Sequence, residues 1–512
     1  MIKAQKLTKL REVITESLRV QRDSMSIGYI NVGHALEDAC AKQNHAIFAR
    51  RGCGKTLLLH YSAKKLKSEI KPIYLNCEDF KRHSFPNVLI EILTSLFREI
   101  NRNLSWWFGK KAKSKKIISD VIEKLIELQR SADQHDEEIR KRFSSERNFG
   151  GEANTSGEAY GVSGKIFAKA EKKTKQEIEQ SFKIHQEKLQ ELDRWLPDLI
   201  EKIRDFFDLS SNTKAIIIQI DDLYHLKRTD QAFVVDYIHR LCKDLPLYFK
   251  IATLRHASTL YADRDGQPIG AQERHDYQPI NIDYTFGDFK KTQDQNWQIL
   301  EQFAEKSGIS KEDIGTLFKG EGFSRLVMAG GGVPRDVLSL FLATLSGLDV
   351  SKGDKIGKDE VRQISRVNFE RKIEELKQDS KSEEQDELLK GIYTIRQFCL
   401  EKRTNLFVVQ EKFLQQNDEW RALFYRLLDY RIIHSCAAAI THKSQEGTYQ
   451  AFSIDIGSYA HLRKLKNRIN EIDVSGSSAK EQMRSAPLLD VDKLDTKIPE
   501  DVEKALLSTE ED

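Results

Sequence analysis

The chain has 512 residues, of which 39% are hydrophobic and 31% charged, and its formal net charge is +3. This length predicts roughly two to four domains, and the composition is typical of a soluble, charge-rich and helix-rich protein. No apolar run approaches the roughly 20 residues that a membrane span needs, and the net charge is too small to imply a partner by itself. The N-terminus lacks the apolar core of a signal peptide and the six cysteines form no CxxC pair. We therefore expect a cytoplasmic protein with reduced thiols, no membrane partner and no zinc site.

Residues 1–25 are predicted to form an amphipathic helix, because four apolar residues recur at helical spacing: Leu7, Leu10, Ile14 and Leu18. An extended segment, residues 26–30, follows just before the next predicted unit. Such a segment can pack on a nucleotide base, or it can be purely structural, and the sequence leaves both possibilities open.

Residues 44–59 predict a short strand, a Gly-rich loop and the start of a helix, which is the order that a phosphate-binding loop needs. The motif is GxxxxGK[ST] with Ala49 in place of the first glycine. Its glycines let backbone N–H groups approach phosphates, Lys55 would reach the β- and γ-phosphates, and the Thr56 hydroxyl would bind Mg²⁺. The predicted nucleotide-binding residues are Gly52, Cys53, Gly54, Lys55, Thr56 and Leu57.

Residues 72–79 predict the next strand and residues 85–100 the next helix. A strand ending in YLNC, followed by FPNVLIEILTSLF, resembles the second strand and helix of the origin-recognition and replication-initiator group of AAA+ ATPases. The resemblance implies ATP as the nucleotide.

Residues 101–210 are predicted to be a helical coiled-coil insertion, because two apolar stripes at helical spacing flank a Gly/Ser-rich run at 148–164. Basic residues gather on both sides of this predicted tip, at 140–147 and 165–175. They would contact nucleic acid or a protein partner, or else form a solvated coiled-coil face with the acidic residues between them.

A largely apolar run at 214–220 predicts a central strand of a parallel sheet, and Asp221 and Asp222 follow it. This is the pattern of a Walker B strand. Asp221 would hold Mg²⁺ through water, and Asp222 would orient or deprotonate the attacking water. The simpler alternative is a buried strand followed by a turn with two surface acids.

Residues 230–244 predict a helix, and 247–255 predict a strand with a polar end. Thr253 and Arg255 at that end are candidates for a residue that senses the γ-phosphate. The run KIATLR and the paired aspartates resemble STAND ATPases of the NB-ARC type. Arg240 on the preceding helix is either an arginine finger for a neighbouring subunit or an ordinary surface residue.

Residues 289–350 predict a small helical lid, and the run Gly-Gly-Gly-Val-Pro-Arg lies near its end. This run resembles the sensor-2 region of initiator-type ATPases and the GxP motif of STAND proteins. The resemblance implies that Arg335 lies over the γ-phosphate, whereas the alternative is a Gly/Pro turn that caps a helix.

Residues 351–384 predict a charged connector and 473–512 a disordered acidic tail. Between them, in 385–472, we predict helices at 387–402, 406–414 and 419–430 and two strands at 431–440 and 449–454, an order that resembles a winged helix. Such a module binds duplex DNA in initiators and packs autoinhibitorily in STAND proteins. The basic candidates for phosphate contact are Arg421, Arg426, His442, Lys443 and the run 463–468.

The predicted fold is therefore an α/β P-loop NTPase sheet, formed by residues 26–100 and 211–288, with a helical lid, a coiled-coil insertion and a C-terminal winged helix. The resemblance implies an ATPase that converts ATP and water to ADP and phosphate as a switch, using Asp222, Arg255 and Arg335, with Mg²⁺ on Thr56 and Asp221. One hypothesis places it in DNA transactions or mobile-element control, with DNA bound by the winged helix and the coiled-coil tip. The alternative is an antiphage defence ATPase that forms a homo-oligomer with ATP and recruits an effector protein.

Overall fold

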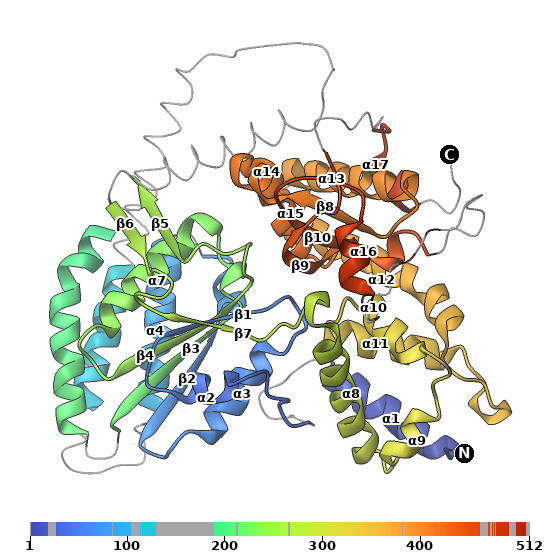
Figure 1. The fold of residues 1–512 in the computed structure, drawn as a ribbon. Helices are drawn as coiled ribbons and strands as arrows, with labels where there is room; N and C mark the ends of the chain where they lie inside the picture. The colour runs from blue at the N-terminus through green and yellow to red at the C-terminus, as the bar shows by residue number, and fades with distance from the viewer. Residues whose placement is uncertain are drawn as a thin grey trace.

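The computed structural model describes the chain except for residues 1, 19–26, 84, 104–112, 114, 130–188, 211–212, 265–266, 381, 461–468, 470, 472–473, 475, 477, 491–497 and 508–512. The described part contains a central parallel sheet with helices on both faces, a helical lid, and a C-terminal unit with its own small sheet (Figure 1). The predicted α/β class with a parallel sheet is confirmed. Within the described residues, no helix is both long enough and apolar enough to cross a membrane.

Five parallel strands form the central sheet in the order β2-β3-β4-β1-β7. Their bounds are β1 His45–Phe48, β2 Ile70–Asn76, β3 Ala215–Asp221, β4 Leu247–Thr253 and β7 Gln278–Asn281. In this register Phe48 lies opposite Thr253, and Asn76 lies opposite Asp221. The segments that follow β1, β3 and β4 therefore leave the sheet at the same edge.

Helices cover both faces of this sheet, and the alternation of side chains along β3 shows why. Ile217 joins the apolar cluster beneath α3 (Lys55–Lys65), whereas Ile216, Ile218 and Ile220 join the cluster of the opposite face. The short helix α2 (Ala35–Cys40) lies beside α3, and the helices of the opposite face are α4 (Asn87–Asn103) and α7 (Arg228–Cys242). The remaining short elements of the core are η1 Cys77–Phe80, η2 Leu223–His225 and the hairpin of β5 Tyr261–Arg264 and β6 Gln267–Gly270.

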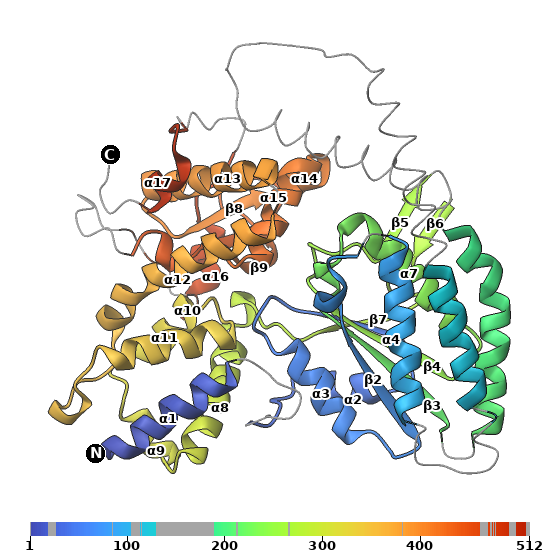
Figure 2. The same cartoon turned by 180° about the vertical axis from the view of Figure 1, so that it is seen from behind.

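Two helical segments of the predicted insertion, residues 115–129 and 189–209, stand beside α4 and add a further layer over that face (Figure 2). Their apolar stripes are buried in the same cluster as α4 and α7. The Tyr237 hydroxyl on α7 donates a hydrogen bond to the Leu192 carbonyl oxygen at 3.0 Å. These segments are thus packed on the core, while the predicted tip at 148–164 and its basic clusters lie outside the described residues.

The lid consists of η3 Phe286–Asp288, α8 Phe289–Lys306, α9 Lys311–Gly315, α10 Gly322–Ala329 and α11 Pro334–Ser346, followed by η4 Val350–Lys352. The predicted N-terminal helix forms as α1 (Ala4–Ser17) and packs on the lid rather than on the sheet. Leu10 and Ile14 of α1 are fully buried in the lid cluster, next to α8. The amphipathic stripe of α1 therefore completes the lid core.

The C-terminal unit contains α13 Ser382–Glu401, β8 Leu406–Gln410, α14 Glu411–Gln416, α15 Asp418–Asp429, β9 Ile433–Thr441, β10 Thr448–Ile454 and η5 Ile456–Ser458. Its sheet has the antiparallel order β8-β10-β9. The predicted helix over 406–414 is wrong for its first five residues, which form β8. The run Leu406–Val409 is completely buried, and a short apolar run of β-branched and aromatic residues suits a sheet interior as well as a helix.

Two further segments differ from the sequence prediction. The predicted charged connector contains a long helix, α12 (Lys358–Asp379), whose Phe369, Ile373 and Leu376 are buried between the lid and the C-terminal unit. The predicted disordered tail contains α16 (Ala479–Arg484) and α17 (Val502–Leu507), which bury apolar residues on the C-terminal unit. Both segments are mostly polar, so their composition predicts no folded structure. Their few apolar residues are buried by parts of the chain that lie far away in the sequence, which composition cannot indicate.

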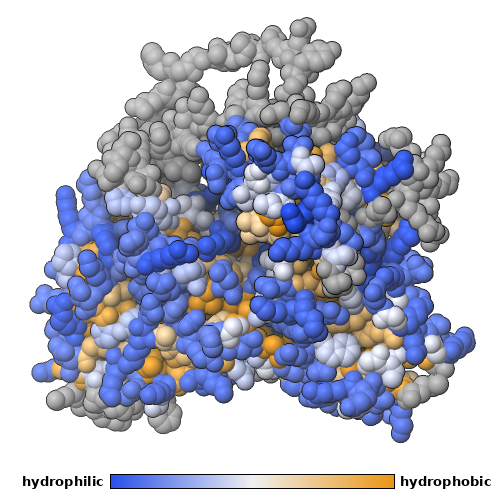
Figure 3. All heavy atoms as spheres, viewed as in Figure 1, coloured by the Kyte–Doolittle hydropathy of each residue, from blue (hydrophilic) through white to orange (hydrophobic). Residues whose placement is uncertain are grey.

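Polar residues cover most of the face shown in Figure 3, and apolar residues gather along the boundary between the sheet and the lid. This boundary is where the carboxyl ends of the central strands meet the lid helices (Figure 1).

Candidate functional site

The Gly-rich loop connects β1 to α3 and has the backbone conformation that its glycines permit. Gly52 and Gly54 have φ values of 86° and 92°, in the left-handed region that side chains with a Cβ rarely adopt. Gly52 is also close to the lid, because a Cβ there would lie 2.8 Å from Cβ of Arg335 and 2.9 Å from Cγ1 of Val333. Helix α3 begins at Lys55, so its N-terminal N–H groups and dipole face the loop.

Lys55 is buried inside this loop. Its Nζ donates hydrogen bonds to the carbonyl oxygens of Ala49, at 2.9 Å, and of Arg50, at 3.3 Å. Burial lowers the pKa of this ammonium, and the nearby Asp222 and Asp221 carboxylates oppose that shift. A cation held by backbone carbonyls at the start of a helix is poised to take an anion as an additional partner.

Asp221 ends β3 and is almost completely buried. The Tyr74 hydroxyl donates to its Oδ2 at 2.8 Å, the Asp222 N–H donates to its Oδ1 at 3.0 Å, and the Thr56 hydroxyl is a further hydrogen-bond partner. Burial and the charge of Asp222 raise the pKa of Asp221 to about 6, although the bonds from Thr56 and Tyr74 lower it. The two residues that the sequence assigned to Mg²⁺ are therefore in contact.

Asp222 has a left-handed backbone, with φ 53° and ψ 44°, which is uncommon for a residue with a side chain. The Tyr224 hydroxyl is a hydrogen-bond partner of the Asp222 carboxylate, and the Arg51 guanidinium lies 4.7 Å from the centre of the Tyr224 ring. The surrounding residues thus fix an unfavourable backbone geometry at the second carboxylate, as is frequent at functional sites.

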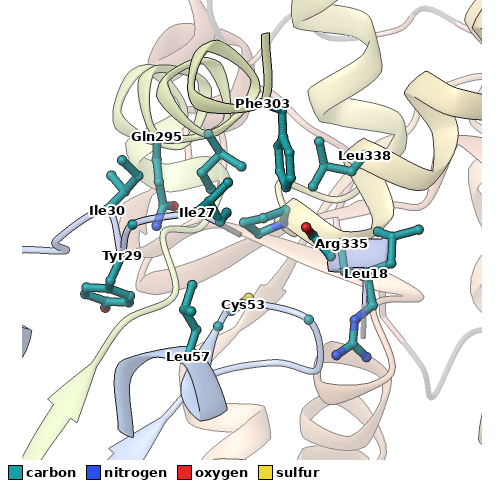
Figure 4. A pocket seen from close by; sticks show the side chains of 16 residues that line it. Leu18, Ile27, Tyr29, Ile30, Cys53, Leu57, Gln295, Phe303, Arg335 and Leu338 are labelled. Atoms are coloured by element: carbon teal, nitrogen blue, oxygen red, sulfur yellow. The ribbon is translucent and has the colours of Figure 1, made fainter. Parts of the chain in front are cut away.

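An open pocket of about 810 Å³ lies between the loop and the lid. Figure 4 shows Tyr29, Phe303 and Arg335 arranged around the loop that carries Cys53. The pocket is lined by the loop from Gly52 to Gly54 with Leu57, the segment Ile27–Ile30, and the lid residues Gln295, Ile299, Phe303, Pro334, Arg335 and Leu338, together with Ser17 and Leu18. Its largely apolar walls with a few polar groups are typical of a small-molecule site.

The predicted sensor residues occupy different surroundings. Arg335 lines the pocket, and its backbone N–H donates to the Gly52 carbonyl oxygen at 3.4 Å. Thr253 is fully buried at the end of β4, where its hydroxyl bonds Ser258. Arg255 pairs with Glu273 at 3.0 Å, and its guanidinium lies 4.3 Å from the centre of the Phe48 ring. These contacts hold Arg255 beside the end of β1, and its sensor role stays a prediction.

Arg240, the candidate arginine finger, already has two partners in its own chain. Its guanidinium bonds Asp236 at 2.8 Å and Asp193 at 2.7 Å. It therefore joins α7 to the helical segment 189–209.

The sequence reasoning missed Arg50, the first variable residue after Ala49. Its guanidinium pairs with Asp283 at 2.6 and 2.8 Å and donates to the Gly331 carbonyl oxygen at 2.9 Å. The pKa of Asp283 is lowered overall because Arg50 outweighs the effect of burial. A second arginine inside the loop motif was the available signal, but its partners lie far along the chain.

The residues present fit a magnesium–nucleotide complex. Gly52 and Gly54 provide a loop that no other residue type would form without strain, and Lys55 provides a buried cation. Thr56 and Asp221 provide the hard oxygen donors that Mg²⁺ prefers, and Mg²⁺ in such sites takes its remaining ligands from phosphates and water.

Together the sheet, the glycine loop and the buried carboxylate define an α/β architecture of the P-loop type. No protein-family model matches the sequence, and no curated protein matches it. Solved structures that match this chain include the following two. The Aeropyrum pernix Orc1 protein in complex with DNA has 13% identity and a TM-score of 0.34, over 88% of this chain and 95% of that chain. Drosophila ORC bound to DNA has 12% identity and a TM-score of 0.33, over 90% and 94%. At this level of similarity neither structure carries an argument about function.

Proposed function

We propose that this chain is an ATPase switch that binds ATP with Mg²⁺ and hydrolyses it slowly. The observation that carries the proposal is the convergence of Lys55, Thr56, Asp221 and Asp222 at one edge of the sheet, next to the Gly-rich loop that lines the pocket between the core and the lid. All four residues come from the two motifs that phosphoryl-transfer proteins of the P-loop type use for phosphate, metal and water.

Each residue has a distinct task in this proposal. Lys55 and the N–H groups of the loop hold the phosphates, and Thr56 and Asp221 hold the metal. Magnesium, when bound, would neutralise charge on the phosphate oxygens. Asp222 orients the attacking water and accepts its proton, while Arg335 places a cation from the lid beside the loop. Catalysis by such a site is mostly positioning and charge stabilisation.

A network of buried charges supports the coupling of this site to the lid and to the C-terminal unit. Arg50 of the loop donates to the Gly331 carbonyl oxygen, and its Nη1 lies 3.4 Å from Nδ1 of His434 on β9. Arg431, which follows α15 in the C-terminal unit, donates a hydrogen bond to Asp336 of α11 at 2.9 Å. These direct contacts would carry a change at the loop to the lid and to the C-terminal unit, which supports the proposal of a switch rather than a purely metabolic ATPase.

We propose duplex DNA as the partner of the C-terminal unit. Its order of helix, strand, two helices and two paired strands is that of a winged helix, a module that binds duplex DNA with its third helix and its hairpin. Four of the basic candidates have partners within the chain: Arg421 bonds Asp418, Arg426 bonds Glu384, His442 bonds the Ala486 carbonyl oxygen, and Lys443 bonds Glu481. The fifth candidate, the run 463–468, lies outside the described residues. DNA phosphates would have to replace these partners, so we expect modest affinity and steep salt dependence.

The test is ATP hydrolysis by the purified chain with and without duplex DNA. We expect slow hydrolysis that DNA stimulates, and Asp222→Asn should reduce the rate about 10²-fold because it removes the acceptor for the water proton. Asp198→Asn, an exposed change on the packed helical segment, is the matched control and should leave the rate unchanged. Hydrolysis indifferent to DNA would contradict the DNA proposal alone, and full activity in Asp222→Asn would contradict the assigned role of this carboxylate.

The acid limb of the pH–rate profile should report Asp221. Because its pKa is about 6 and its ionised form is needed for the metal, the rate should fall as the pH drops through that value. Tyr74→Phe removes a hydrogen bond that lowers this pKa, so the acid limb should move to higher pH. Rates measured between pH 5 and 8 at a fixed, subsaturating Mg²⁺ concentration check this prediction, and an acid limb that does not move in Tyr74→Phe would contradict it.

A further inference from the structure

Helix α8 of the lid carries a buried amide side chain that lines the pocket. Gln295 is only 8% exposed, yet no hydrogen bond joins its side-chain amide to another described residue. Its neighbour Asn296 is also buried but is bonded, because its Nδ2 donates to the carbonyl oxygens of Thr292, at 2.8 Å, and of Gly332, at 3.0 Å. Buried polar side chains nearly always have hydrogen-bond partners, so the amide of Gln295 indicates a partner that comes from outside the chain.

The amide lies at the end of the pocket away from the lid arginine. Figure 4 shows that it points away from α8, toward the segment that carries Tyr29 and Ile30. Arg335 lies on the opposite side of the loop that carries Cys53 (Figure 4). The proposed function places the phosphates beside this loop and Arg335. The amide of Gln295 is therefore at the end of the pocket where the base of a bound nucleotide would lie.

The walls around this amide are held in place by contacts within the chain. Gln302, two turns after Gln295 on α8, accepts a hydrogen bond from the Gly28 N–H at 2.9 Å, and this bond fixes the segment Ile27–Ile30 beside the helix. Ile299, one turn after Gln295, lines the pocket as well. A flat ring can pack between these apolar side chains while the amide meets its polar edge. Few polar groups in an apolar pocket are the usual means by which a protein orients and selects a small ligand.

We infer that Gln295 selects adenine by two hydrogen bonds, to N7 and to the 6-amino group of the base, an inference that rests on the proposed nucleotide site. A glutamine amide donates through its NH₂ group and accepts through its oxygen, so it can pair with N7 and the amino group together. Guanine has acceptors at both positions, so one bond is lost and the amide oxygen faces another acceptor. A site whose buried polar group is left unpaired in this way rejects the ligand.

The decisive measurement is the ratio of the dissociation constants of GTP and ATP, by calorimetric titration of the full chain with Mg²⁺. We expect wild type to bind ATP about ten- to hundredfold more tightly, which is the usual discrimination by a bidentate amide. Gln295→Met has a similar length but forms neither bond, so the ratio should fall close to one. Gln298→Met, an exposed change on the same helix, is the matched control and should leave the ratio unchanged.

The outcomes separate the inference from the proposed function. An unchanged ratio in Gln295→Met, or a wild type that binds ATP without preferring it to GTP, overturns the inference and leaves the proposed function intact. Failure of wild type to bind either nucleotide overturns the proposed function itself.

A change in the ligand provides a test on the wild-type chain that does not depend on the folding of a variant. In 7-deaza-ATP a C–H group replaces N7, so the bond from the amide NH₂ group of Gln295 is lost. Wild type should bind this analogue about tenfold more weakly than ATP, because the buried donor is left without a partner. Gln295→Met should bind the two nucleotides equally. If wild type bound 7-deaza-ATP as tightly as ATP, the amide would not contact N7 and the inference would fail.

Discussion

Replacement of Lys55 by alanine is expected to raise the dissociation constant for ATP about 10²-fold or more and to abolish measurable hydrolysis. Lys55 is buried in the loop, where its Nζ is already held at 2.9 Å from the Ala49 carbonyl oxygen. Removing one partner of a buried, hydrogen-bonded charge pair costs about 2–5 kcal/mol, and each 1.4 kcal/mol is a factor of ten in affinity. Titration with a fluorescent ATP analogue measures the change.

The matched control for this substitution lies on the same helix. Lys64 is exposed near the end of α3, so Lys64→Ala removes an equal charge far from the loop and should leave nucleotide affinity unchanged. The thermal unfolding midpoint of each variant shows whether the fold survives. If a folded Lys55→Ala chain bound ATP as tightly as wild type, the nucleotide would bind elsewhere and the central assignment would be wrong.

The parts of this site that lie close together in the sequence were predictable from it. Gly52 to Thr56 form the end of the loop and the first residues of α3, and this short motif determines both the backbone geometry and the charge. Asp221 was predictable because a run of buried β-branched residues followed by carboxylates has one common explanation in a parallel sheet. In both cases the neighbouring residues in the sequence determine the local structure, so the prediction needs no knowledge of tertiary contacts.

The parts that depend on contacts between distant segments were not predictable. Arg50 pairs with Asp283 more than 200 residues away, and Asp429 meets the loop at 256–257 only because the C-terminal unit folds back onto the sheet. No periodicity or motif encodes such pairs in a single sequence. The same reason explains β8, whose apolar run suits a strand or a helix until β10 supplies its hydrogen-bond partners.

Among the substitutions considered, the largest loss of stability is expected where a buried ion pair is broken, and no sequence motif predicted this pair. Lys372 of α12 and Asp455, just after β10, are both completely buried, with Nζ 2.6 Å from Oδ2. Asp455 also lies 3.2 Å from Nε2 of His434 and accepts the Gly457 N–H at 2.9 Å. The pKa of Asp455 is lowered overall because Lys372 outweighs burial, so the carboxylate is ionised and depends on its partner.

Lys372→Met should therefore lower the free energy of unfolding of the C-terminal unit by about 3–5 kcal/mol, since it leaves a buried carboxylate without its counter-charge. Lys377→Met on the same helix breaks a partly exposed pair with Glu503 and should cost less than about 1 kcal/mol. Urea unfolding followed by tryptophan fluorescence compares the two variants, because Trp420 is buried in this unit.

The double variant Lys372→Met/Asp455→Asn is the control for this prediction. Its neutral amide keeps hydrogen-bonding capacity without an unpaired charge, so part of the stability should return. Equal losses in Lys372→Met and Lys377→Met would mean that the buried pair contributes no more to stability than a surface pair, and the prediction would be wrong.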